Sequence, residues 1–229
     1  MDLVSWLGPE TVKNVAFPLI FTAKVAAISL AMHAIFGLIL GYYLGKKTSP
    51  LRSAIDALVT LPLVFPPIAL GFVLLLILGR TGLIGRYVSG VFGVEIIFNL
   101  WGVVIAAFVA GLPLIVKPVQ AAVQSSAVSL IEASYTLGKS ESETFIYVVV
   151  PSIKKSIAGG LSLAFGRSLG EVGLTLMLGG NIVGRTNTLS LEIYNSVFTG
   201  EFARAGLLAA LLGSVSLLIL LLLKKLSVS

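Results

Sequence analysis

Long uncharged apolar runs constrain this chain more than any other feature. Four runs exceed the roughly 18 residues that a helix needs to cross a bilayer, at positions 25–44, 57–79, 96–116 and 205–223. A fifth, 157–178, is interrupted by Arg167 and Glu171. With 57% hydrophobic and 11% charged residues, the chain carries more apolar surface than a soluble domain of 229 residues buries. It is therefore predicted to be an all-α, polytopic membrane helix bundle with about five transmembrane helices.

The spans occupy most of the sequence, so we expect one transmembrane domain over 1–229 and no soluble catalytic domain. The predicted spans are listed here: 16–44, 54–79, 96–117, 154–179 and 204–223. The first run is too long for a signal peptide and lacks a small-residue cleavage site, so it is expected to be retained. Its polar lead-in, 2–22, suits a short surface helix.

Basic residues beside the spans predict the orientation, because cytoplasmic loops carry an excess of lysine and arginine. One side receives Lys46, Lys47, Arg52, Lys117, Lys139, Lys154, Lys155, Lys224 and Lys225, and the other receives Lys13, Arg80, Arg86, Arg185 and Arg204. This bias places the amino terminus outside and the carboxy terminus in the cytoplasm. Orientation also explains the net charge of +6, so no nucleic-acid partner is expected.

The longest predicted cytoplasmic loop, 117–156, contains a coupling loop, 126–151, that is organised rather than irregular. Its first part, 129–137, is expected to be a helix that ends at Gly138, because glycine best tolerates the left-handed C-cap conformation. Ser140 and Glu143 have the spacing of a capping box, which predicts a second helix, and Pro151 is expected to end the apolar run that follows.

The sequence contains no complete motif for catalysis or metal binding. The residues before Ser140 resemble the end of a phosphate-binding P-loop, but Ala133 replaces its first glycine and a helix precedes it instead of a strand. His33 lies in an apolar span, where a packed or hydrogen-bonded histidine is the favoured interpretation over a ligand. With no cysteine either, we expect no catalytic residues, metal or cofactor.

The same loop resembles the EAA loop of ATP-binding-cassette importer permeases, E-A-A-x3-G-x9-I-x-L-P. The residues that match are Glu132, Ala133, Ser134, Gly138, Val148, Val150 and Pro151, with conservative departures at Ser134, Val148 and Val150. The resemblance implies a type I importer permease fold in which this loop forms a coupling helix that docks on the ATPase. It assigns ATPase coupling to Glu132, Ala133, Ser134, Gly138 and Pro151.

Further segments resemble the molybdate permease subunits of such importers. They are LPLVFPP at 61–67, LGRTGLIG at 78–85, FGRSLGEVG at 165–173 and NIVGRTNTLSL at 181–191. The resemblance implies import of molybdate or the related tungstate by alternating access. Sulfate- or thiosulfate-type oxyanion permeases share much of this pattern and remain an alternative. An ion-coupled secondary transporter is a second alternative, but the EAA-type loop argues against it.

Pro62, Pro66 and Pro67 fall in the second predicted span. Proline removes a backbone donor and bends a helix, which a membrane tolerates only where neighbouring helices or a water-filled cavity satisfy the backbone. The span is therefore expected to line the translocation path, and a kink used only for packing remains the alternative.

Arg167 and Glu171 are four residues apart in the fourth predicted span, so on one helix they would share a face and pair. Burying charge in a membrane is costly, and a pair is tolerated, so the alternatives are a structural ion pair and a position beside the path. Together with Ser168 they are candidate path or gate residues. Glycines in this span predict close helix packing.

The resemblance also implies the partners. They are a second copy of the chain, two cytoplasmic ATPase subunits and an extracytoplasmic molybdate-binding protein, assembled in the inner membrane. The path would lie on the two-fold axis of the homodimer. The chain itself would be no enzyme, because the partner ATPase would hydrolyse ATP.

Overall fold

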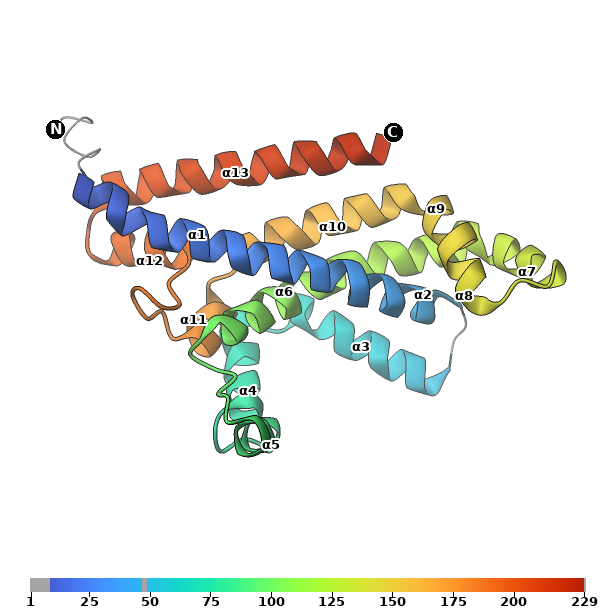
Figure 1. The fold of residues 1–229 in the computed structure, drawn as a ribbon, viewed down its shortest axis with the longest axis horizontal. Helices are drawn as coiled ribbons and strands as arrows, with labels where there is room; N and C mark the ends of the chain where they lie inside the picture. Colours follow the sequence, from blue (N-terminus) through green and yellow to red (C-terminus); the bar gives the residue numbers. More distant parts are fainter. Residues whose placement is uncertain (1–8, 47–48, 229) are drawn as a thin grey trace. The chain divides into compact units, whose positions relative to one another are not determined.

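The computed structural model describes residues 9–46 and 49–228, and these form two compact units. Unit 1 comprises Met1–Ser29, Pro66–Ala107 and Ser168–Ser216; unit 2 comprises Leu30–Phe65, Phe108–Arg167 and Leu217–Ser229. The described residues contain helices and no strand (Figure 1). The predicted all-α fold is confirmed.

Helices α4, α5, α11 and α12 belong to unit 1, and α2, α3, α7, α8 and α9 belong to unit 2. The bounds in unit 1 are α4 Pro67–Leu78, α5 Leu83–Phe92, α11 Gly173–Gly179 and α12 Leu189–Phe198. Those in unit 2 are α2 Leu38–Lys46, α3 Pro50–Val64, α7 Val128–Thr136, α8 Glu141–Thr144 and α9 Val150–Ser152. Four helices contribute residues to both units: α1 Pro9–Met32, α6 Leu100–Ala122, α10 Lys154–Leu169 and α13 Phe202–Val228.

Within the described residues, three helices are long and apolar enough to cross a membrane. They are Val15–Lys46, Leu100–Ser125 and Phe202–Leu222. Two bent helix pairs raise the number to as many as five if each pair is one span. The exact bounds of the five predicted spans stay predictions, and the expected surface helix over 2–22 lies partly outside the described residues. Its described part, from Pro9, belongs to α1.

The second predicted span contains a break where its prolines cluster. Helix α3 ends at Val64, Phe65 is extended (φ −77°, ψ 140°), and Pro66 caps α4, which begins at Pro67. Pro62 lies inside α3. Proline at the first turn of α4 costs no hydrogen bond, because that turn has no intrahelical acceptor for its N–H groups.

The fourth predicted span is also interrupted, which corrects one premise. Helix α10 ends at Leu169 and α11 begins at Gly173, so Arg167 lies in the last turn of α10 and Glu171 lies beyond its end. The two residues therefore do not share the face of one helix, as their spacing had suggested. Their pairing stays a prediction without that support.

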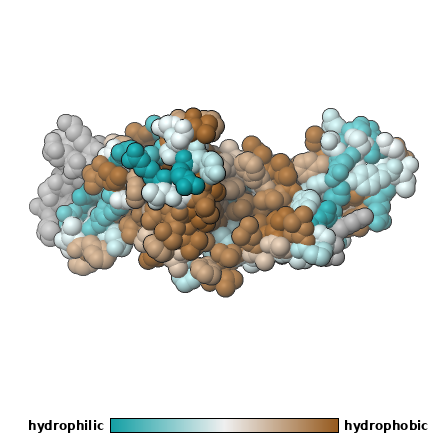
Figure 2. Space-filling view, turned by 90° about the horizontal axis from the view of Figure 1, so that it is seen from below, coloured by the Kyte–Doolittle hydropathy of each residue, from teal (hydrophilic) through white to brown (hydrophobic). Residues whose placement is uncertain are grey.

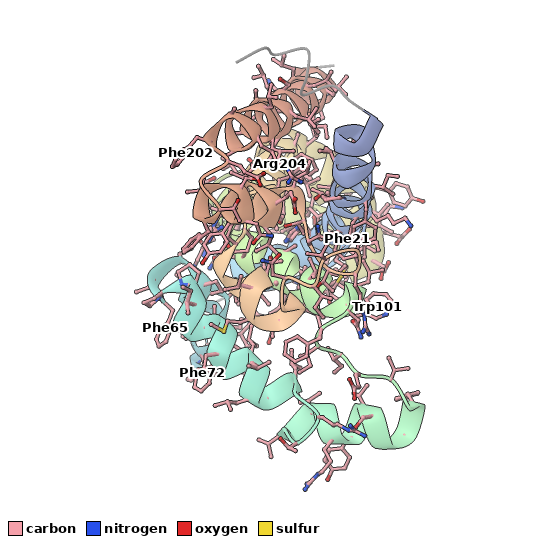
Figure 3. The ribbon with its side chains drawn as sticks, turned by 90° about the vertical axis from the view of Figure 1, so that its left-hand side faces the viewer. Phe21, Phe65, Phe72, Trp101, Phe202 and Arg204 are labelled. Atoms are coloured by element: carbon pink, nitrogen blue, oxygen red, sulfur yellow. The ribbon has the colours of Figure 1, made fainter. Side chains whose placement is uncertain are left out.

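In unit 1, α4 and α11 pack closely through glycine. A Cβ at Gly71 would lie 2.9 Å from the Cβ of Met177, and one at Gly173 would lie 2.9 Å from the Cβ of Pro67. Aromatic side chains also cover the outside of this unit: Phe72 is 51% exposed, Trp101 51% and Phe202 70% (Figure 3). Such exposed apolar surface suits contact with lipid or another membrane protein.

In unit 2, three glycines spaced four apart, one in the π-helical turn before α2 and two in α2, pack on α6 and on the first residue of the π-helical turn Val123–Ala127 that follows it. Gly37, Gly41 and Gly45 face Ile115, Val119 and Val123 in the same order. A Cβ would lie 2.6 Å from Val119 Cγ1 at Gly41, and 2.7 Å from Val123 Cβ at Gly45. Small residues at this spacing let two helix backbones approach closely, which is how helices associate where water supplies no driving force.

His33, next to this stripe, is fully buried. It lies in a π-helical turn, His33–Gly37. Its Nε2 is 2.9 Å from the Phe108 carbonyl oxygen, and its ring stacks on that of Phe108 at 5.2 Å. The predicted packed, hydrogen-bonded histidine is confirmed.

We expect Gly41→Ala to destabilise the protein by about 1–3 kcal/mol, because the added methyl group overpacks the α2–α6 contact. Gly159→Ala is the matched control: it also lies in a helix, but its Cβ would meet nothing within 4 Å. There, alanine is expected to be neutral or to stabilise by up to about 1 kcal/mol. Thermal unfolding in detergent measures both, and equal midpoints for the two variants would contradict the packing argument.

Candidate functional site

The predicted coupling loop forms a helix, a corner and a second helix within unit 2. Helix α7 ends at Thr136, the corner holds Gly138, and α8 begins at Glu141. A π-helical turn, Phe145–Val149, and α9 follow. Hydrophilic side chains gather over this part of unit 2 (Figure 2). The predicted helix–glycine–helix arrangement is confirmed.

Gly138 has a φ of +77°, the left-handed conformation that the sequence predicted. Its N–H donates to the Tyr135 carbonyl at 3.0 Å, and the Lys139 N–H donates to the Ser134 carbonyl at 3.1 Å. These bonds satisfy carbonyls at the end of α7 that have no intrahelical partner. The corner is therefore closed by its own backbone.

The capping box at the start of α8 is also present. The Glu143 N–H donates to Ser140 Oγ at 3.3 Å, and the Ser140 N–H donates to Glu143 Oε2 at 2.9 Å. Hydrogen bonds from the Ser140 backbone and from Lys139 lower the pKa of Glu143 to about 2. The carboxylate therefore stays ionised near neutral pH and keeps its capping role.

The predicted coupling residues do not all face solvent. Glu132, Ala133 and Gly138 are exposed, as is Leu137, which is 81% exposed at the tip of the corner. Ser134 is buried instead: its hydroxyl donates to the Ile131 carbonyl at 2.8 Å and lies 2.8 Å from Thr144 Oγ1. Ser134 thus ties α7 to α8 and offers no side chain to a partner.

Pro151 differs slightly from its predicted role. It lies in the first turn of α9, where proline is tolerated, and the helical backbone continues to Ser152. The chain then bends by 78° before α10. The turn therefore comes just after the proline rather than at it.

An anchor that the sequence did not reveal holds the corner to α2. Lys46 Nζ donates to Glu141 Oε1 at 2.6 Å and to the Tyr135 hydroxyl at 3.1 Å. One turn earlier, the Tyr42 ring packs on Phe145, with centroids 4.8 Å apart. Both sides of the corner are therefore attached to the end of the first long helix.

The candidate path residues are distributed over both units. Pro62 and Arg167 belong to unit 2, whereas Pro66, Pro67, Ser168 and Glu171 belong to unit 1. Pro66 and Pro67 are exposed. Ser168 and Glu171 are buried.

The polar side chains of Ser168 and Glu171 satisfy backbone groups within unit 1. Ser168 Oγ donates to the Ala107 carbonyl at 2.9 Å. Glu171 Oε1 accepts the Leu174 N–H at 2.8 Å, which caps the start of α11. Both residues thus support the local fold in this conformation.

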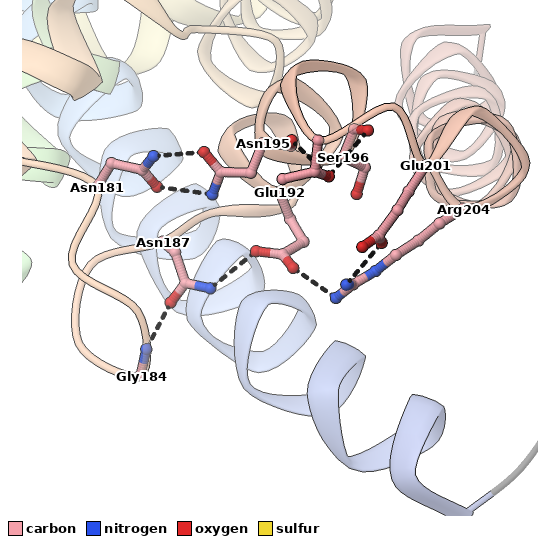
Figure 4. A network of polar contacts seen from close by, with 9 residues as sticks. Asn181, Gly184, Asn187, Glu192, Asn195, Ser196, Glu201 and Arg204 are labelled. Carbon is pink, nitrogen blue, oxygen red and sulfur yellow. Dashed lines mark hydrogen bonds and ion pairs between the residues drawn. The ribbon is translucent and has the colours of Figure 1, made fainter.

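The segment 181–191, one of those that resembled molybdate permeases, is held by a polar network in unit 1 (Figure 4). Arg204 Nη2 donates to Glu192 Oε1 at 2.5 Å, and Glu192 Oε2 accepts from Asn187 Nδ2 at 3.2 Å. Asn187 Oδ1 in turn accepts the Gly184 N–H at 2.9 Å. The amides of Asn181 and Asn195 pair at 2.7 Å and 3.3 Å. Side-chain hydrogen bonds therefore join this segment to α12, and α12 to α13.

Comparison with known protein families shows to which family the chain belongs. Residues 37–226 match the family described as binding-protein-dependent transport system inner membrane component. The chain belongs to this family. It is accordingly a multi-pass membrane subunit of a transport system and not itself an enzyme.

Three relatives illustrate the range within this transport-permease family. The chain is similar to the molybdenum transport system permease protein ModB of Escherichia coli strain K12, with 34% identity over 87% of this chain and 89% of the relative. It is 42% identical to the "Probable transport system permease protein NifC" of Clostridium pasteurianum over 65% of this chain, which spans about half (51%) of that relative. The "Probable sulfate transport system permease protein cysT" of Prototheca wickerhamii is 29% identical over 88% of this chain and 79% of the relative.

Gly138→Val should lower the free energy needed to open the corner of this permease by about 1–2 kcal/mol, because a β-branched residue is strongly disfavoured in the left-handed conformation. Gly138→Asn is the matched control, since asparagine tolerates that conformation. Amide hydrogen exchange of residues 139–144 measures the opening. Equal protection in the two variants would show that the backbone conformation of Gly138 does not hold the corner.

Arg204→Gln should lower the stability of unit 1 by about 3 kcal/mol, because it leaves the buried Glu192 carboxylate without its ion-pair partner. Arg80→Gln is the comparison: Arg80 pairs with Glu95 at 3.7 Å on the surface, where loss of a pair costs at most about 1 kcal/mol. Thermal unfolding of both variants tests the contrast, and a larger loss for Arg80→Gln would refute it.

Proposed function

We propose that the chain is the membrane permease subunit of an ATP-driven importer for molybdate, with tungstate as a close second substrate. The observation that carries the proposal is the solvent-facing corner of unit 2, formed by Glu132, Ala133, Leu137 and Gly138. Its sequence has the spacing of the EAA loop of ATP-binding-cassette importers. Similarity to ModB over most of both chains supports molybdate as the cargo.

In this proposal two copies of the chain form a homodimer with the path on the two-fold axis. Two cytoplasmic ATPase subunits dock on the corners, and an extracytoplasmic binding protein delivers the oxyanion. The amino terminus lies outside and the carboxy terminus in the cytoplasm of the inner membrane. ATP-driven closure of the ATPases moves the corners and switches the access of the path from one side to the other.

The anchor at Lys46 supports a mechanical role for the corner. Because Lys46 and Tyr42 attach α8 and its π-helical continuation to α2, a displacement of the corner pulls directly on the first long helix. A loop without such contacts would move alone. We further propose, from the sequence, that the path runs beside Pro62, Pro66 and Pro67, and that Arg167, Ser168 and Glu171 influence its gate.

Two alternatives are separated by transport measurements. The first alternative is a sulfate-type permease, and the similarity to the cysT relative is the observation that supports it. An ion-coupled secondary transporter would use the charges of the fourth predicted span for coupling. It leaves the organised corner without a role, so we favour the ATP-driven importer.

Uptake into proteoliposomes that contain the permease, its ATPase and its binding protein tests the proposal. We expect molybdate uptake to require both ATP and the binding protein. Excess tungstate should inhibit this uptake more strongly than excess sulfate does. Uptake driven by an ion gradient without ATP, or preferred transport of sulfate, would contradict it.

A further inference from the structure

A polar groove lies within unit 2, and none of the coupling residues or candidate path residues lines it. Its volume is about 400 Å³. The lining residues come from α2, α3, α6 and the turn after α6: Leu44, Arg52, Ser53, Asp56, Ala57, Thr60, Lys117, Gln120 and Gln124. Most of these side chains are polar or charged in a chain of which 11% is charged. The groove therefore lies at the cytoplasmic ends of the first three predicted spans, where the sequence also places Arg52 and Lys117. A concave site lined by several convergent polar groups is a candidate binding site.

The groove is formed by two helix faces with regular spacing. Arg52, Asp56 and Thr60 recur every four residues on α3. Lys117, Gln120 and Gln124 recur at three and four residues along the end of α6 and the turn that follows. Residues with these spacings lie on one side of a helix, so each helix presents a continuous polar stripe to the cavity.

The chemistry of the groove suits an anion. Arg52 and Lys117 supply two positive charges, and Gln120 and Gln124 supply amide N–H donors. The amides of Gln120 and Gln124 make no side-chain hydrogen bond to any described residue of the chain. The Arg52 guanidinium lies over the Tyr43 ring, with Cζ 4.3 Å from the ring centroid.

One carboxylate occupies part of this donor set. Both oxygens of Asp56 accept from Lys117 Nζ, at 2.7 Å and 2.8 Å. The two side chains are only about one-third exposed, 31% for Asp56 and 34% for Lys117. Asp56 therefore stands where an external oxyanion would bind Lys117, and it competes with that anion for the same ammonium group.

We propose that this groove is a weak, transient binding site for a tetrahedral oxyanion on the cytoplasmic side of the path, where the anion displaces Asp56 from Lys117. The proposal rests on the proposed function for the identity of the anion and on the predicted orientation for its side. Asp56 keeps the site weak. A transport path needs sites that bind well enough to admit an ion and poorly enough to release it.

The test measures binding of radiolabelled molybdate to the purified full-length chain in phosphatidylcholine nanodiscs. Asp56→Asn should tighten binding about fivefold, the effect expected when a partly exposed charge is removed from an ion pair. Lys117→Gln should weaken it by at least about fivefold, and Gln120→Leu, which leaves the ion pair intact, should also weaken it. Unchanged affinity in Asp56→Asn and Lys117→Gln would overturn the proposal.

Matched controls separate the groove from general charge effects. Glu95→Gln removes a carboxylate from an ion pair in unit 1 and should leave molybdate affinity unchanged. Tightening equal to that of Asp56→Asn would overturn the proposal. If Asp56→Asn does not fold, the losses in Lys117→Gln and Gln120→Leu decide the matter alone.

Two further arms identify the source of the anion. Adding phosphatidylglycerol to the nanodiscs should leave molybdate binding unchanged. If phosphatidylglycerol instead competes with molybdate in the unchanged chain but not in Lys117→Gln, the groove binds a lipid phosphate, and its proposed role in transport is overturned. If the variants shift molybdate binding as expected but the proteoliposomes fail to import molybdate, the proposed function fails and the anion site stands. If import succeeds and no variant shifts binding, the groove proposal alone fails.

Discussion

The close contact of α2 with α6 is the interaction on which the functional part of unit 2 depends. Glycines at 37, 41 and 45 let the two backbones approach. Tyr42 and Lys46, each next to one of these glycines in sequence, reach the coupling corner. Lys117 and Gln120, from the facing part of α6, line the polar groove. Added bulk in the glycine stripe would therefore disturb both the corner and the groove.

A second constraint is that backbone groups at helix ends and buried charges need hydrogen-bond or ion-pair partners. The structure meets it locally. Gly138 and Ser140 satisfy the ends of α7 and α8, Glu171 caps α11, and Arg204 neutralises Glu192 in the network around 181–191. These contacts make fixed structures of segments that join helices.

The sequence predicted those features that depend on neighbouring residues. Long apolar runs indicated the helices, and glycine with a capping-box pair indicated the corner at Gly138 and Ser140. These follow from backbone conformation and local hydrogen bonds, which a short stretch of sequence determines. The family resemblance then located the candidate coupling residues.

The sequence analysis missed contacts between residues that are not neighbours in sequence, and it missed one break within a predicted helix. The anchor of Lys46 on Glu141 joins residues 95 positions apart, and no local pattern marks it. The Arg167–Glu171 premise was wrong because it assumed an unbroken helix, whereas Gly170 and Gly173 flank a break. Ser134 was expected at a docking surface, but its hydroxyl is hydrogen-bonded to that of Thr144 and the residue is buried.

The most direct test of ATPase docking uses the fact that the chain has no cysteine. A single Ala133→Cys substitution places one thiol on the exposed face of the corner, and Ala203→Cys places one on an exposed site in unit 1. With single-cysteine variants of the ATPase, we expect disulfide cross-linking to Ala133→Cys that changes when ATP binds, and none to Ala203→Cys. Cross-linking that is absent at Ala133→Cys, or equal at both positions, would contradict the account.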